Sequence, residues 1–268
     1  MAEKAAFDGI AAQYDADFTH SAVGQMQRQQ VHAYLENFLT EKGKCRILEL
    51  NCGTGEDARW LAERGHAVSA TDLSPEMIRV ATTKQSPGHQ LEFRTQDILG
   101  SLRAATGKYD LVFSNFGGFN CLSPEELAEA GRLLGRALAQ GGHFIGVVMA
   151  RTCLWESFYF GFKRDRKQAF RRRKGGPLEV KLDTAHTQLT WYYHPRHLRR
   201  AFSPRLDQDH QRPIGFFLPP SYLDPYFQKH PQRLARLQRM EMRVAGWPFL
   251  ARYSDHYLVD FSLLNAPS

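Results

Sequence analysis

A buried strand followed at once by a glycine-rich turn constrains this chain more than any other feature. The strand is the mostly apolar run Cys45–Leu50, and the turn contains Gly53 and Gly55. Glycine has no Cβ, so a ligand can approach the backbone closely at these positions. We expect the turn to open a helix over 57–64, whose unpaired N–H groups would favour an anionic or carboxylate-bearing group.

A carboxylate, Asp72, ends the next expected strand. The spacing in sequence between the glycine turn and Asp72 places the carboxyl end of the second strand beside that of the first. There the Asp72 side chain can accept hydrogen bonds from both hydroxyls of a ribose. The turn reads Asn51-x-Gly53-x-Gly55, so it lacks the third glycine of the dinucleotide-binding fingerprint. The pattern therefore predicts a nucleoside site, and it does not fit a dinucleotide fold.

These residues resemble the first motif of the class I S-adenosylmethionine (SAM) dependent methyltransferases, an acidic residue followed by x-G-x-G-x-G. Glu49 corresponds to the acid, and Gly53 and Gly55 correspond to the second and third glycines. Asn51 replaces the first glycine, a mild departure because Asn tolerates the left-handed backbone region. The resemblance implies SAM as cofactor and S-adenosylhomocysteine as product.

Two further segments extend the resemblance. It assigns Asp97, after the third expected strand, to the adenine amino group and the N–H of Ile98 to the ring, although an Asp at such a junction often caps a helix. The fourth expected strand, 109–115, delivers Asn115 and Phe116 to the carboxyl edge of the sheet, where ligands bind in open α/β folds. The expected cofactor site therefore also includes Asp97, Ile98, Asn115 and Phe116. Leu73, the residue after Asp72, is assigned to it as well.

The amino-terminal segment and three histidines supply further candidates. In similar enzymes an arm folds across the cofactor, and the resemblance assigns Tyr14 and Arg28 to the carboxylate of SAM. The candidate general bases are His20, His194 and His197, because an imidazole titrates near neutral pH. None of the three has a motif around it, and the sequence shows no metal-ligand cluster, so no metal is expected.

Strands that alternate with helices predict an α/β fold with a mostly parallel sheet. The resemblance makes this a Rossmann-like methyltransferase sandwich with an antiparallel edge pair and a helical, aromatic substrate lid. The expected parts are an amino-terminal helical arm over 1–40, a SAM-binding core over 41–150, and a lid insertion with the completing strands over 151–268. Within the last part we expect helix 195–202. The other expected elements are a hairpin of Leu178–Leu182 with Thr187–Tyr193 and an edge pair of Ile214–Leu218 with Tyr257–Leu263.

Positive charge is concentrated in the carboxyl half. Residues 1–150 contain 14 Lys and Arg against 18 Asp and Glu, whereas residues 151–268 contain 21 against 10. Eight of these cations fall within Lys163–Lys174. Three interpretations are open for this run: a phosphate-tracking surface for tRNA or another nucleic acid, an electrostatic funnel for an anionic small substrate, and a solvated helix face.

Aromatic side chains flank the basic run and favour a lid. Phe158 and Phe162 share one helical face, and Trp155 and Tyr159 share another, as expected of a helix packed onto the cofactor domain. No RNP motif is present, and the fourth strand lacks the Asn/Asp-Pro-Pro-aromatic motif of amino-group nucleic-acid methyltransferases. A nucleic acid is therefore the less favoured acceptor.

The remaining sequence features concern membrane spans, secretion and the state of the cysteines. No apolar run reaches the roughly 18 residues that a membrane span needs, and the amino terminus lacks a secretory signal. The cysteines show neither a metal-ligand nor a disulfide pattern, so reduced thiols in a cytoplasmic protein are expected. Cys52 lies in the cofactor turn and is assigned to that site. The four cysteines are Cys45, Cys52, Cys121 and Cys153.

The leading functional interpretation is a SAM-dependent methyltransferase that acts on oxygen or nitrogen of a small, aromatic or anionic metabolite. An RNA (tRNA) or protein methyltransferase that uses the basic half is the first alternative. A nucleoside-binding module without transfer activity is the second.

Overall fold

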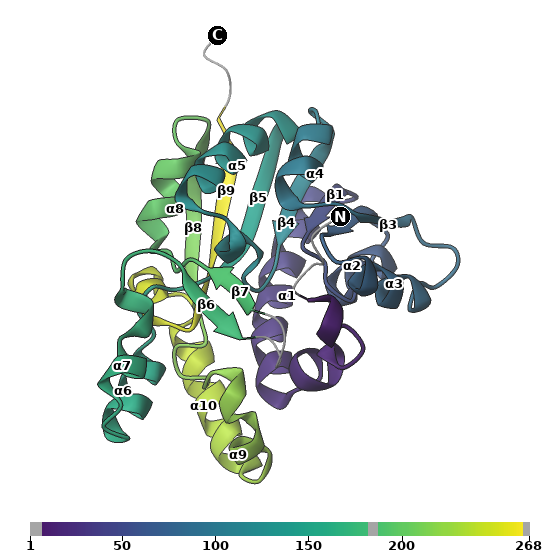
Figure 1. Ribbon diagram of the computed structural model, residues 1–268. Coiled ribbons are helices and arrows are strands. Elements are labelled where there is room, and N and C mark those ends of the chain that lie inside the picture. The colour runs from purple at the N-terminus through teal and green to yellow at the C-terminus, as the bar shows by residue number, and fades with distance from the viewer. Residues whose placement is uncertain (1–6, 182–186, 265–268) are drawn as a thin grey trace.

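A computed structural model describes residues 7–181 and 187–264 of the 268-residue chain. At its centre is a seven-stranded sheet with the order β3-β2-β1-β4-β5-β9-β8 (Figure 1). Strands β1 to β5 are parallel, and β9 is antiparallel to β5 and β8. The strands are β1 (Arg46–Leu50), β2 (Ala67–Asp72), β3 (Leu91–Thr95), β4 (Tyr109–Ser114), β5 (Leu138–Met149), β8 (Leu206–Ile214) and β9 (His256–Leu263). The expected α/β class, mostly parallel with an antiparallel edge, is confirmed.

Strand β1 lies at the point where the strand order reverses. It pairs with β2 from Arg46↔Ala67 and with β4 from Ile47↔Leu111. Side chains on both of its faces are buried, as the continuous apolar run predicted. The carboxyl ends of β1 and β4 therefore form the crevice in which open α/β sheets bind ligands.

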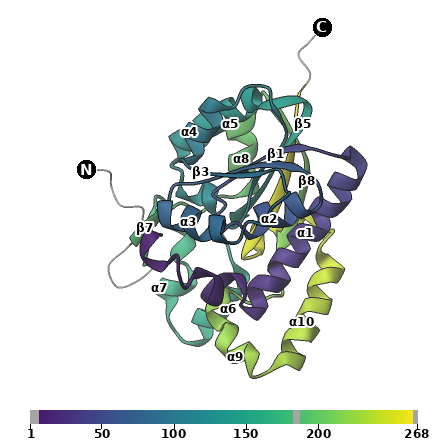
Figure 2. The same cartoon turned by 90° about the vertical axis from the view of Figure 1, so that its right-hand side faces the viewer.

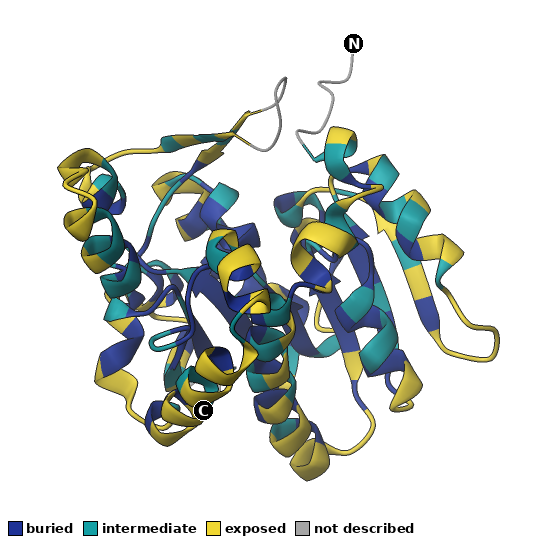
Figure 3. Cartoon of the chain, turned by 90° about the horizontal axis from the view of Figure 1, so that it is seen from below, coloured by how far each residue is buried: buried dark blue, intermediate teal, exposed yellow. Residues whose placement is uncertain are grey.

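Helices cover both faces of the sheet (Figure 2). One face carries α1 (Ala22–Lys42), α2 (Glu56–Glu63) and α3 (Pro75–Thr83), and the other carries α4 (Ile98–Ala104), α5 (Pro124–Ala137) and α8 (Pro195–Phe202). Leu35 and Leu61 pack with Ile47 in the first core, and Leu102 and Leu134 belong to the second. Figure 3 shows the buried strands between helices that turn exposed residues outward. This sandwich holds the strand ends rigidly in place.

Two element boundaries differ slightly from expectation. Helix α2 begins at Glu56 and ends at Glu63, each one residue before the expected bound, and α5 ends at Ala137. Strand β5 starts at Leu138 because Leu138 already pairs with Tyr109, and a register shift follows before Leu111. Gly141, at φ +70°, lies inside this irregular stretch and does not end the helix.

The expected edge pair is wrong in one of its two strands. β9 is confirmed, but its partner is β8, so only Ile214 of the predicted segment Ile214–Leu218 is in a strand. The backbone N–H groups of residues 215–218 all donate to the buried carboxylate of Glu241 instead. Pro213 is tolerated in β8 because β8 is at the edge of the sheet.

The carboxyl half adds short elements below the sheet (Figure 1). The hairpin β6–β7 is confirmed and pairs Leu178↔Thr190, but its second strand ends at Thr190, short of the expected Tyr193. Leu182 of the first expected strand lies outside the described residues. Helix α8 has the expected bounds. The added helices and strands are α6 (Leu154–Phe162), α7 (Arg166–Ala169), β6 (Leu178–Lys181), β7 (Thr187–Thr190), α9 (Asp224–Gln228) and α10 (Pro231–Val244). Single turns are η1 (Asp8–Ile10), η2 (Asp15–Thr19), η3 (Gly118–Cys121), η4 (Arg171–Arg173), η5 (Ser221–Leu223) and η6 (Pro248–Tyr253).

The expected aromatic face of the lid does not pack onto the cofactor core. Phe158 and Phe162 on α6 are 72% and 93% exposed. Trp155 instead contacts the small cluster around Val23 and Phe227, and its indole N–H donates to the carbonyl of Phe217 at 2.9 Å. This contact fixes α6 to the cluster formed by α1, α9 and α10, so Phe158 and Phe162 remain in solvent.

Two arginines of the basic run belong to a buried ion network. Arg172 is 7% exposed and bonds to Glu156 at 2.8 Å and to Asp255 at 2.7 Å. Arg171 also pairs with Glu156, at 2.6 Å. The run Lys163–Lys174 is therefore partly structural, not simply a solvated face. Among the helices that the structure describes, none is both long and apolar enough to cross a membrane.

Candidate functional site

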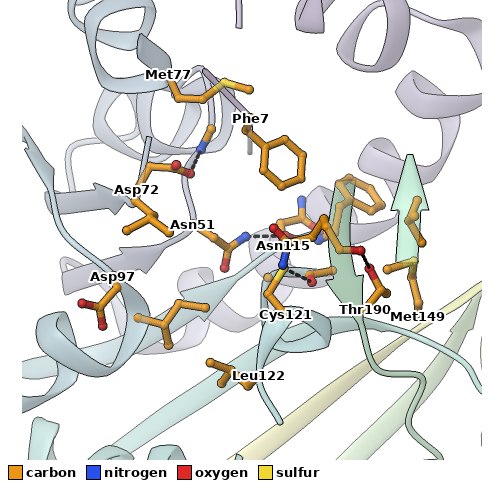
Figure 4. Close-up of a pocket in the computed structure, with 18 of the residues that line it drawn as sticks. Phe7, Asn51, Asp72, Met77, Asp97, Asn115, Cys121, Leu122, Met149 and Thr190 are labelled. Carbon is orange, nitrogen blue, oxygen red and sulfur yellow. Dashed lines mark hydrogen bonds between the residues drawn. The ribbon is translucent and has the colours of Figure 1, made fainter. Parts of the chain in front are cut away.

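A cavity of about 420 Å³ opens at the carboxyl edge of the sheet (Figure 4). Its walls come from the ends of β1 to β5, the amino-terminal arm and the hairpin β6–β7. Nine residues that the sequence assigned to the cofactor line it: Tyr14, Asn51, Gly53, Asp72, Leu73, Asp97, Ile98, Asn115 and Phe116. The structure thus brings together side chains that are up to 102 positions apart in the chain.

The turn after β1 adopts the left-handed backbone that its composition predicted. Asn51, Gly53 and Gly55 have φ of 49°, 54° and 78°. The Asn51 amide donates to the carbonyl of Asn115 at 2.7 Å, and its oxygen accepts from the Ser114 hydroxyl at 2.6 Å. Asn51 therefore does what a glycine could not do, because it links the ends of β1 and β4.

Asp72 points toward the cavity from the end of β2 (Figure 4). Its two oxygens accept from the backbone N–H groups of Gly53 and Ser74, each at 2.9 Å. A carboxylate offers about four acceptor sites, so each oxygen can take a further donor such as a hydroxyl. Burial raises the pKa of Asp72 by more than the hydrogen bonds from these two N–H groups lower it.

Asp97 caps helix α4 and also lines the cavity. One oxygen accepts from the N–H of Gly100 at 2.7 Å and caps α4, while the exposed carboxylate also lines the cavity. Ile98, the next residue, lies in the first helical turn, whose N–H groups lack intrahelical partners. Figure 4 shows Asp97 on the same side of the cavity as Asp72.

The amino-terminal arm is fastened across the glycine turn. The Asp15 carboxylate accepts from the Thr54 hydroxyl at 2.5 Å and pairs with Lys84. Asp8 accepts from the Ser74 hydroxyl at 2.5 Å. These contacts place the Tyr14 side chain in the cavity wall, where burial raises its pKa.

A buried polar cluster supports the site from beneath. Asp57 on α2 pairs with Arg28, contacts His32 at 2.7 Å and accepts from the Asn115 amide at 2.8 Å. Burial alone would raise the pKa of Asp57, but Arg28 and His32 lower it well below its usual range. Arg28 is therefore engaged with Asp57 and does not line the cavity.

Three other sequence candidates also lie outside the lining. Glu49 is 1% exposed on β1, and burial, reinforced by Asp57, raises its pKa well above the usual value. Cys52 is buried and its pKa is raised for the same reason, which makes it a packed thiol. Gly55 is required because a Cβ there would lie 2.8 Å from the Phe93 ring. All three shape the turn and do not face the cavity.

The three candidate histidines are not brought to this cavity. His20 is exposed at the end of η2. His194 and His197 line two neighbouring cavities instead. Their assignment as general bases therefore has no geometric support in the described residues.

Sequence reasoning missed the far wall of the cavity as a binding surface. Asn120, fully buried, accepts from the N–H of Met149 at 2.8 Å and donates to the carbonyl of Trp191 at 2.6 Å. It thus joins the β4 loop, the end of β5 and the hairpin. The only indication of this wall in the sequence is that Met149 is the last residue of a strand, and strand ends lie at the edge of the sheet. The missed lining residues are Phe7, Met77, Gln96, Leu99, Cys121, Leu122, Glu126, Met149, Val180, Gln188, Thr190 and Tyr192.

Within the described residues, one cluster has ligand types that could hold a metal ion. It consists of His143, Asp209 and Asp260. Asp260 already accepts from the Tyr34 hydroxyl at 2.6 Å and contacts His143 at 2.8 Å. Internal hydrogen bonds account for this cluster, and none of its members lines the central cavity.

Comparison with known proteins identifies the central domain. Residues 47–142 match the family described as methyltransferase domain. The chain is 37% identical over 106 residues to the putative methyltransferase YqeM of Bacillus subtilis, covering 40% of each chain. It is 30% identical over 152 residues to the malonyl-[acyl-carrier protein] O-methyltransferase of Pseudescherichia vulneris, covering 57% of this chain and 55% of the relative. The matches thus span about half of these relatives.

The fold is shared over a longer stretch. A SAM-dependent methyltransferase structure from Methanosarcina mazei superposes with a TM-score of 0.57 at 17% identity, covering 83% of this chain and 94% of that chain. The structural likeness therefore covers more of the chain than the sequence matches do.

Proposed function

We propose that this chain, whose residues 47–142 match a methyltransferase-domain family and whose fold is shared with a SAM-dependent methyltransferase structure, transfers a methyl group from SAM to a small-molecule acceptor. The observation that carries the proposal is that Asp72 and Asp97 line the same cavity beside a glycine turn. Asp72 would accept from the ribose hydroxyls and Asp97 from the adenine amino group. Asn51 and Gly53 leave room for the rest of the cofactor, which Tyr14 covers.

Catalysis here depends on positioning and on exclusion of water. Bound SAM supplies an electrophilic methyl group on a sulfonium, and the chain's residues hold the acceptor in line with it. Leu122 and Met149 give the far wall an apolar surface. Asn120 fixes three loops of that wall through its hydrogen bonds, so the distance between the two reactants is set by the fold.

The lining also restricts the chemistry of the acceptor. Among the described residues, no Lys, Arg or His lines the cavity, whereas three carboxylates do: Asp72, Asp97 and Glu126. Glu126 is occupied by a capping bond from the N–H of Ser123 at 2.8 Å. Burial raises the pKa of Tyr192, so this phenol is a poor base. We therefore propose methylation of an oxygen or nitrogen that is nucleophilic without help from a protein base, with any anionic part of the acceptor bound elsewhere.

Transfer of a labelled methyl group tests this function. The protein is incubated with methyl-tritiated SAM and a cell extract separated into dialysable metabolites, RNA and protein. We expect label in the metabolite fraction. Label in RNA or protein would favour the alternative acceptors, and SAM binding without transfer to any fraction would favour a nucleoside-binding module.

Gly118→Ala should damage the cofactor site. A Cβ at this position would lie 2.0 Å from the Asn51 side-chain oxygen, so the bonds that join β1 to β4 must shift. We expect SAM affinity to fall at least about tenfold, about 1.4 kcal/mol, with a destabilisation of about 1 to 3 kcal/mol.

The matched control is Gly161→Ala, where the new Cβ meets nothing within 4 Å. This glycine lies in helix α6, so alanine should be neutral or slightly stabilising. Calorimetric titration with SAM and thermal unfolding measure both variants. If Gly118→Ala behaves like Gly161→Ala, close packing at Asn51 is not needed for the site.

A further inference from the structure

Four arginines and a histidine surround a second cavity that the proposed function does not use. This arginine cavity has a volume of about 450 Å³ and is lined by Arg151, Arg173, Arg196, Arg252 and His194, with Thr152 and Tyr253. The arginines come from the end of β5, from η4, from α8 and from η6. Segments separated by up to about 100 positions in the sequence thus converge on one opening.

Within residues 7–181 and 187–264, no carboxylate balances the positive charge of this cavity. No Asp or Glu lines it, and none of its four arginines forms an ion pair with a carboxylate of the described residues. The neighbouring Arg171 and Arg172 show the opposite arrangement, because both pair with Glu156. Four cations around one opening create a strong local field that favours an anion.

Several guanidinium groups are held in place without an ion pair. Arg151 donates to the carbonyl of Arg173 at 3.1 Å. Arg173 lies over the Phe170 ring at 4.7 Å, and Arg252 lies over the Tyr253 ring at 4.7 Å. Burial and the surrounding arginines lower the pKa of His194 to about 4, so its ring is neutral until an anion arrives. Planar guanidinium donors of this kind match the oxygens of a phosphate.

A third cavity shares lining residues with both the arginine cavity and the central cavity. Arg151 also lines an intermediate cavity of about 440 Å³, together with Trp191 and Tyr192. Tyr192 lines the central cavity too. Arg151 follows Met149, a central-cavity residue, by two positions, a span of about 7 Å in extended chain. An acceptor that lies along this intermediate cavity would contact both the arginine cavity and the central one.

We propose that the arginine cavity binds a phosphate group carried by the methyl acceptor. The acceptor would then be a phosphorylated small molecule, a monoester or diester, whose body lies along the intermediate cavity and whose reactive end enters the central one. The inference rests on the proposed function. It also explains how a central cavity without cations can serve an anionic substrate.

Calorimetric titration with inorganic phosphate, and then with phenyl phosphate, tests this site in the full chain without SAM. We expect both to bind, and phenyl phosphate to bind more tightly because its ring reaches the intermediate cavity. Arg196→Gln and Arg252→Gln should each weaken binding about tenfold or more. Arg199→Gln, an exposed arginine on the same helix α8 that lines none of these cavities, should leave it unchanged.

NMR spectroscopy distinguishes phosphate bound at this site from anions that are attracted to the surface in general. Bound phosphate favours the charged imidazole, so NMR titration of His194 should show its pKa rise when phosphate is added to the wild type but not to Arg196→Gln. Phosphate affinity that is equal in all variants would overturn the proposal. So would tight binding of a short RNA with no measurable binding of phenyl phosphate, because that result would assign the surface to nucleic acid.

Titration with SAM, carried out separately, distinguishes the two proposals. If SAM binds and phosphate does not, the phosphate site fails alone. If phosphate binds in the arginine-dependent manner and SAM does not, the phosphate site stands and the proposed methyl transfer fails.

Discussion

Replacing Arg172 by methionine is expected to lower the free energy of unfolding by about 3 to 5 kcal/mol. The guanidinium is 7% exposed, and its partners Glu156 and Asp255 are 2% and 4% exposed. Arg172 also donates to the backbone carbonyl of Asp255 at 3.0 Å. Its loss would leave two buried carboxylates with weaker compensation, from Arg171 and His256 alone. Urea unfolding followed by circular dichroism measures the change.

Lys167→Met is the matched control for this variant. It removes an exposed cation from the same basic run, and it should change stability by no more than about 0.5 kcal/mol. Equal effects of the two substitutions would mean that the buried network contributes nothing. An unchanged Arg172→Met protein would contradict the structural role of the run directly.

The same network gives the stability a defined pH dependence. Burial would raise the pKa of Asp255, but His256 and Arg172 lower it well below its usual range in the folded chain. A group whose pKa is lower in the folded chain than in the unfolded chain stabilises the fold at pH values above its unfolded pKa, about 4. This contribution is lost as the pH falls toward the folded pKa. The difference between wild type and Arg172→Met should therefore be largest near neutral pH and shrink in acid.

Asp72→Ala is expected to weaken SAM binding by about 1 to 3 kcal/mol, about 5- to 150-fold. The substitution removes the acceptor for two ribose hydroxyls and also the acceptor that holds the N–H groups of Gly53 and Ser74. Because burial raises the pKa of Asp72, affinity in the wild type should fall as pH drops through that raised value. Titration calorimetry at two pH values measures both effects.

Glu92→Ala is a suitable control for Asp72→Ala. Glu92 lies on the adjacent strand β3, is exposed, and pairs only with Arg94 at the surface among the described residues. SAM affinity should be unaffected. Asp72→Ala with wild-type affinity, in a protein that remains folded, would remove the ribose assignment.

The layered core and the cofactor turn were predictable from the sequence because they depend on local chemistry. The apolar run 45–50 cannot be exposed, and the positive φ angles at Gly53 and Gly55 exclude most other residues. Parallel strands then bring Asp72, Asp97 and Asn115 to one edge without further information. These residues meet in the cavity as expected.

The carboxyl half was less predictable because its contacts are distant in sequence. The apolar segment 214–218, followed by prolines, resembled a strand, and nothing local shows that Glu241 captures four of its N–H groups. The aromatic spacing on α6 correctly predicted a helix but not which face would be covered. The arginine cavity is another such case, since it gathers residues from four separate elements.

A crystal structure of the protein with S-adenosylhomocysteine tests the central claim most directly. We predict that the ribose hydroxyls lie within hydrogen-bond distance of Asp72 and that the adenine amino group lies beside Asp97, with the thioether facing Met149. An adenosyl group bound away from these two carboxylates, or a cavity that accepts a nicotinamide nucleotide and refuses S-adenosylhomocysteine, would contradict the account.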